Sequence, residues 1–150
     1  MKRILKQSLA LAAISVTAAW AGTLVLEVGN PAANAEAKSM NAVVVARATA
    51  CHEPAKSIVT AHLVQSNNGE IQRTPLQVVP LKTDGTFAVL GTVPRDAVID
   101  LAVTNPEFRN YQPRVLLRSD SHGVQWAGVR RFFSKPPTES DIKSLLEAVD

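Results

Sequence analysis

The sequence contains one cysteine among its 150 residues, which excludes a disulfide within the chain. Cys51 is therefore a free thiol, a metal ligand, or one half of a bridge between chains, as in a Cys51-linked dimer. Without a covalent cross-link, a domain of this size must be held together by its hydrophobic core.

The sequence also lacks the common catalytic motifs. No Gly-x-Ser-x-Gly, His-Glu-x-x-His, P-loop or dinucleotide-binding pattern occurs. Cys51-His52 is not preceded by the first cysteine that a Cys-x-x-Cys-His haem attachment motif requires. We therefore expect no resident cofactor and no enzymatic activity.

A large excess of positive charge is absent as well once the N-terminus is set aside. The whole chain has 16 basic and 13 acidic residues. Removal of Lys2, Arg3 and Lys6 leaves 13 basic residues, so the remainder is formally neutral. This balance argues against a nucleic-acid partner.

The N-terminus has the pattern of an export signal. Three basic residues precede an uncharged stretch over residues 8–20, and small residues stand at Ala19 and Ala21, at the end of that stretch. We expect a signal peptide over residues 1–21, secretion or a periplasmic location, and no stable membrane span after cleavage. A retained anchor is the alternative, because the uncharged run over residues 7–26 is long enough to span a bilayer.

A second cleavage site follows Ala35. The uncharged stretch over residues 8–20 already has the usual length of the apolar part of a signal. A cut after Ala35 would place Glu27 and Pro31 before the site. Cleavage after Ala21 is therefore favoured, which makes residues 23–28 the first strand of the mature protein.

The central part of the chain, residues 22–135, reads as an antiparallel β-domain. Short runs rich in β-branched residues alternate with turn signals such as Asn68-Gly69 and Asp84-Gly85. The runs comprise residues 23–28, 41–50, 57–65, 76–81, 86–90, 97–104, 114–118 and 123–133. We expect an all-β, immunoglobulin-like or transthyretin-like sandwich of about seven to eight strands. Pro80 makes residues 76–81 the candidate edge strand.

The last segment, residues 136–150, predicts one C-terminal amphipathic α-helix. Thr138 is a candidate N-cap, and apolar residues recur with helical spacing at Ile142, Leu145, Leu146 and Val149. We expect this apolar stripe to pack on the β-domain.

The segment over residues 84–117, DGTFAVLGTVPRDAVIDLAVTNPEFRNYQPRVLL, resembles the closing half of the carboxypeptidase regulatory-like domain. The similar features are the Asp84-Gly85-Thr86-Phe87 turn and strand, the strand after Pro94, and Asn105-Pro106-Glu107-Phe108. The resemblance implies a transthyretin-like β-sandwich and a non-catalytic accessory or binding module.

Two groups of residues are candidates for a site. Cys51 and His52, with His62 or His122, would supply the thiolate and imidazole ligands that copper and zinc accept. The second candidate is a basic binding surface, because residues 109–135 contain six basic residues against Asp120 alone. Its expected members are Arg114, Arg118, Trp126, Arg130 and Arg131. An acidic C-terminal segment lying against this face and neutralising it is the structural alternative.

The sequence therefore favours an exported, non-enzymatic β-sandwich protein that binds or scaffolds another component of the cell envelope. An envelope protein or an anionic polymer would be its partner. The alternative is a periplasmic protein that binds copper or zinc through Cys51, His52 and another histidine.

Overall fold

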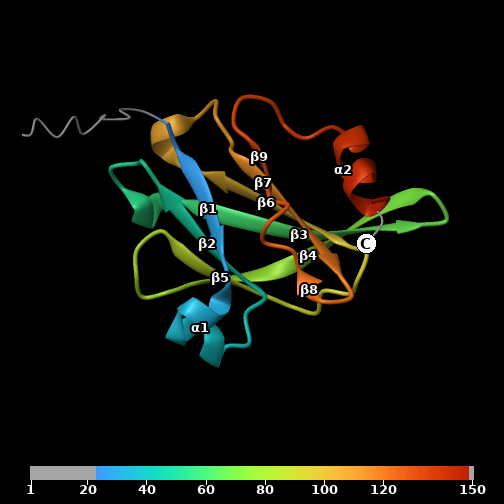
Figure 1. The fold of residues 1–150 in the computed structure, drawn as a ribbon. Coiled ribbons are helices and arrows are strands. Elements are labelled where there is room, and N and C mark those ends of the chain that lie inside the picture. The colour runs from blue at the N-terminus through green and yellow to red at the C-terminus, as the bar shows by residue number, and fades with distance from the viewer. Residues whose placement is uncertain (1–22, 149–150) are drawn as a thin grey trace, which may run out of the picture.

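The structure is a computed structural model, and it describes residues 23–148 (Figure 1). The predicted signal peptide over residues 1–21 and the predicted helical residue Val149 lie outside the described residues. No helix among the described residues is long and apolar enough to cross a membrane.

Antiparallel strands are the main regular structure of the described chain, as predicted. In order along the chain, the strands are β1 (Val25–Gly29), β2 (Val44–Thr49), β3 (Ile58–Asn67), β4 (Glu70–Pro80), β5 (Thr86–Leu90), β6 (Val98–Thr104), β7 (Arg114–Asp120), β8 (Gly123–Val124) and β9 (Arg130–Phe132). They pair in the order β1-β2-β5-β4-β3-β6-β7-β8, and β9 also pairs with β7. The pairings therefore connect all of the strands into a single curled sheet.

The remaining elements are helical. The α-helices are α1 (Ala35–Ser39) and α2 (Glu139–Leu146), and the 3-10 turns are η1 (Pro31–Ala33), η2 (Pro54–Lys56) and η3 (Pro106–Phe108). α1 was not among the predicted elements. Its signal is the side chain of Asn34, which caps the helix by accepting a hydrogen bond from the Ala37 amide at 2.9 Å.

Strand β4 makes the sheet bend. Its first part pairs with β3 up to Leu76, and its second part pairs with β5 from Gln77 onward. The prediction of an edge strand at residues 76–81 is confirmed only in part: β4 as a whole lies in the interior of the strand order, but residues 77–80 pair with β5 alone. Proline has no backbone N–H to donate to a neighbouring strand. Pro75 and Pro80 are tolerated because each part of β4 pairs with one neighbour among the described strands, so N–H groups on its other side have no strand to bind.

One further boundary differs from the prediction. Residues 123–133 read as a single strand, but they form the short strands β8 and β9 with residues 125–129 between them. Trp126, in this interruption, is partly buried and packs against the core. Its side chain anchors the segment where backbone pairing stops.

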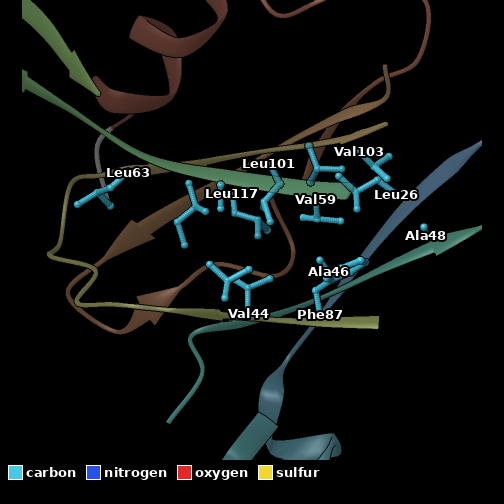
Figure 2. Close-up of a cluster of buried hydrophobic side chains, with 14 of the residues drawn as sticks. Leu26, Val44, Ala46, Ala48, Val59, Leu63, Phe87, Leu101, Val103 and Leu117 are labelled. Atoms are coloured by element: carbon cyan, nitrogen blue, oxygen red, sulfur yellow. The ribbon is translucent and has the colours of Figure 1, made fainter. Parts of the chain in front are cut away.

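The main core lies on the inner face of the curled sheet. Side chains from β1, β2 and β5 meet those from β3, β6 and β7, and Figure 2 shows the two layers facing each other. The predicted alternation in β3 is confirmed, since Val59, Ala61 and Leu63 are all buried on this face. Leu24 and Leu26 are also fully buried in it, so the segment around β1 belongs to the fold.

Helix α2 covers part of the outer face, as its apolar stripe predicted. Ile142 and Leu145 pack against Val64, Val98 and Leu116 in a second core cluster. The predicted N-cap is also confirmed: the Asp141 amide donates to the Thr138 hydroxyl at 3.2 Å, and the Thr138 amide donates to the Asp141 carboxylate at 2.7 Å. The helix lies beside β6 and β7 (Figure 1).

Candidate functional site

Two long connections meet at one end of the sheet. Residues 50–57 join β2 to β3 and include the Cys51-His52-Glu53 motif, and residues 105–113 join β6 to β7. Both contain a 3-10 turn begun by proline, η2 in the first and η3 in the second. The pairing of β3 with β6 brings the two connections together, because Ile58 lies opposite Thr104.

Asn105 holds the two connections against each other. Its side chain is buried, and its amide nitrogen donates to the Glu53 carbonyl at 3.1 Å and to the Ser57 hydroxyl at 2.9 Å. Its amide oxygen accepts a hydrogen bond from the Glu107 backbone at 3.0 Å, which caps η3. One buried side chain therefore fixes both loops.

His52 and Glu107 form a second link. The His52 backbone amide donates to one carboxylate oxygen of Glu107 at 3.0 Å, and the His52 ring nitrogen Nδ1 contacts the other oxygen. The hydrogen bond and the negative charge of Glu107 raise the pKa of His52 above its ordinary value, and the hydrogen bonds from His52 lower the pKa of Glu107. The His52 side chain itself is 92% exposed, so the imidazole is held in place at the surface.

The four predicted metal ligands do not form a group. Cys51 is half-buried and packs against the core, while His52 faces Glu107. His62 lies on the outer face of β3 opposite Asp100, and His122 lies in the turn after β7 with its Nδ1 3.8 Å from the Asp120 carboxylate. Among the described residues, no three His, Cys, Asp or Glu side chains are placed to hold a metal ion together.

A hollow of about 440 Å³ lies beside the linked loops. It is lined by apolar side chains, including Ile58, Phe108 and Tyr111, and by the basic residues Lys56 and Arg109. Ile58 is 63% exposed, which is unusual for a large aliphatic residue in a strand. We call this feature the loop-end hollow.

Tyr111 sits at the wall of the loop-end hollow and packs against the main core. Its hydroxyl is buried and has no hydrogen-bond partner among the described residues. Burial raises the pKa of this hydroxyl, because the ionised form is disfavoured away from water.

Charges of both signs lie around the loop-end hollow. Lys56 forms an ion pair with Glu53 at 2.7 Å, and Glu107 is paired with His52. Arg109 adds a further cation to the lining of the hollow. An apolar centre with a mixed-charge rim is the usual composition of a protein-protein contact.

The predicted basic surface is largely used within the molecule. Arg114 and Arg73 both bind the buried carboxylate of Asp100, with an Arg73 Nη1 to Asp100 Oδ2 distance of 2.7 Å. Arg130 donates to the Ser144 hydroxyl of α2 at 2.9 Å, and Arg131 donates to the Leu26 carbonyl of β1 at 3.0 Å.

Arg118 and Trp126, the other members of that predicted surface, also make contacts inside the molecule. Arg118 donates to the Ala148 carbonyl just after α2. Trp126 is partly buried and packs on the core. The C-terminal segment thus lies against the basic segment, the placement that the structural alternative predicted, and it contacts Arg130 and Arg118 through a serine hydroxyl and a backbone carbonyl.

Comparisons of the chain with protein-family models, curated proteins and solved structures find no match. The resemblance of residues 84–117 to the carboxypeptidase regulatory-like domain therefore stays a prediction.

Glu107 and Asn105 are the site residues that sequence reasoning did not assign to the site. Glu107 is 55 positions from His52, so no local pattern connects them. Asn105 did carry a signal, because Asn followed by Pro is a typical start of a helical turn. That signal indicates a cap, but it does not reveal the contacts with Glu53 and Ser57.

Proposed function

We propose that this protein is an exported, non-enzymatic binding module that docks another protein of the cell envelope at the loop-end hollow. The export signal is the basis for the location, and the shared core between the two halves of the sheet supports a sandwich-like packing. The observation that supports this proposal most directly is the exposure of Ile58. This large aliphatic side chain is 63% exposed and lines a hollow that is also lined by aromatic residues.

A protein partner fits this surface better than an anionic polymer. A polymer would need several unpaired cations in a row, whereas Arg114, Arg130 and Arg131 are engaged by groups of the same chain. A protein partner could insert an apolar side chain beside Ile58 and meet the mixed charges at the rim. The links through Asn105 and His52 would keep both loops in place before binding.

Substitution of Ile58 tests the proposal. In cells that produce the exported protein, Ile58→Glu should abolish co-purification of a stoichiometric partner that wild type retains, because a carboxylate would be desolvated in the contact. The matched control is Met40→Glu, which alters another exposed apolar side chain at the end of α1. A partner retained equally by Ile58→Glu, or lost equally in Met40→Glu, would contradict docking at this surface.

A further inference from the structure

A second hollow lies on the outer face of the sheet, and it shares no lining residue with the loop-end hollow. Glu27, Arg47 and Thr86 stand directly opposite one another on β1, β2 and β5. Their neighbours in sequence, including Leu26, Ala46 and Phe87, contribute to the main core, so this row points to the opposite face. The row therefore presents three polar side chains side by side.

Flanking turns close the sides of this row. Asn34, at the start of α1, and Thr83, in the turn before β5, line a hollow of about 340 Å³ together with the row. Gly29 also lines it and contributes no side chain; an added Cβ there would meet no atom within 4 Å. We call this feature the outer-face hollow.

Thr86 provides the observation that points to a ligand. Its side chain is 5% exposed, and its hydroxyl is buried with no hydrogen-bond partner among the described residues. Most buried hydroxyls in folded proteins are paired, since an unpaired one loses its bonds to water without compensation. Thr86 also lines the outer-face hollow, so a polar ligand there would supply that partner once a small side-chain movement uncovers the hydroxyl.

The charges of the site select the class of ligand. Both Nε and Nη2 of Arg47 donate to the Oε2 atom of Glu27, with an Nε to Oε2 distance of 2.9 Å. The pair is neutral overall and leaves Oε1 as an acceptor and Nη1 as a donor. An anionic ligand would be repelled by Glu27, and a zwitterion would have to separate the pair.

The geometry points to the outer-face hollow as a binding site for one ring of a neutral sugar. Sugar hydroxyls both donate and accept, which matches the mixture offered by Glu27, Arg47 and the two threonines. The amide nitrogen of Asn34 adds a donor, because its oxygen already accepts from Ala37. A volume of about 340 Å³ lies at the small end of ligand pockets and suits a single ring.

Titration of the ¹⁵N-labelled mature chain, followed by NMR, tests this inference. The neutral probes are N-acetyl-d-glucosamine and methyl α-d-glucopyranoside, and the charged probes are d-glucuronate and glycine. At least one neutral sugar should shift the amide signals of Arg47 and Thr86 saturably and more strongly than either charged probe. No saturable shift with the neutral sugars, or tighter binding of glucuronate or glycine, would overturn the inference.

Two variants locate the binding. Gly29→Val should abolish the shifts, because its side chain fills the hollow without straining the strand, whereas Gly128→Val, also in open space, should bind normally. Thr86→Val should weaken binding roughly 3- to 10-fold, the loss expected for one neutral hydrogen bond. The Thr86→Val variant should still give the NMR spectrum of a folded protein, because the native hydroxyl has no hydrogen-bond partner among the described residues. Unchanged binding in Gly29→Val would also overturn the inference.

Discussion

At the scale of single residues, Asn105 has the largest structural role near the proposed docking surface. It contacts the Glu53 carbonyl, the Ser57 hydroxyl and the Glu107 amide, and these groups belong to two different loops. Because Ser57 is also buried, its hydroxyl could not exchange the lost contact for water easily. The shape of the loop end therefore depends on one amide side chain.

Asn105→Ala should lower the free energy of unfolding by about 2–4 kcal/mol, since it removes three hydrogen bonds and leaves buried partners unsatisfied. Urea denaturation monitored by circular dichroism measures the change. Asn110→Ala, at an exposed position in the same loop, is the control and should have little effect. Equal stability of the two variants would show that Asn105 does not hold the loops together.

The pairing of His52 with Glu107 predicts a pH-dependent link between the loops. The pKa of His52 is raised from its ordinary 6.5, so its contribution is fully present below pH 6.5 and is lost as the pH rises through the folded-state pKa. The pKa of Glu107 is lowered from 4.5, so its contribution is present above pH 4.5 and is lost as the pH falls through the folded-state pKa. The link is therefore complete between about pH 4.5 and 6.5.

Glu107→Gln should lower the pKa of His52 toward 6.5, because it removes both the charge and the strongest hydrogen bond of the imidazole. NMR titration of the His52 ring protons measures this pKa. Glu53→Gln is the matched control and should produce a smaller decrease, since Glu53 acts on His52 only through its charge. A His52 pKa unaffected by Glu107→Gln would mean that the pair does not form in solution.

Residue patterns predicted only part of this site. The Cys51-His52-Glu53 run identified the correct loop, because such side chains are uncommon together in a β-rich sequence. It suggested a metal site, whereas the partner of His52 is Glu107, and four strands separate the two residues along the chain. Which residues of separate loops come together depends on the register of the strands between them. That register is a property of the fold, so a local sequence pattern does not reveal it.

At the scale of elements, alternation and turn signals predicted most of the strands. The Asn68-Gly69 hairpin is observed, and both residues have the positive φ angles that this turn requires. The failures have local causes. Residues 70–75 are mostly exposed and polar, so the first part of β4 gave no hydrophobic signal, although β3 pairs with it residue by residue.

Strand β1 connects the fold with the choice of cleavage site. A mature chain that starts at Glu36 would lose Leu24 and Leu26, which are fully buried, and also the carbonyl that Arg131 binds. Burial of two leucines contributes about 3–6 kcal/mol, a large share of the stability of a typical domain. A chain starting at Gly22 is therefore expected to be folded, and one starting at Glu36 unfolded.

N-terminal sequencing of the exported protein and thermal unfolding of the two recombinant chains check this prediction. Gly22 should be the first residue of the exported form, and cooperative unfolding should be seen for that chain alone. A natural start at Glu36, together with cooperative unfolding of the shorter chain, would show that β1 is dispensable.

At the scale of the whole molecule, the arginines of the basic segment are hydrogen-bonded within the chain. Arg130 donates to Ser144 of α2, Arg118 donates to the Ala148 carbonyl just after α2, and Arg131 donates to Leu26 of β1 at the other end of the strand order. The same arrangement joins the two ends of the curled sheet. The net charge of each segment could be predicted from the sequence. The hydrogen-bond partners of the arginines could not, because they depend on how the fold brings distant segments together.

The central claim is that the loop end, rather than the basic segment, contacts a protein partner. Its most direct test is a photo-activatable phenylalanine analogue at position 58, compared with the same analogue at exposed position 72 in the β3–β4 hairpin, in cells that export the protein. Position 58 should give one discrete cross-linked protein product, and position 72 should give none. No product at position 58, or the same product at both positions, would contradict the claim.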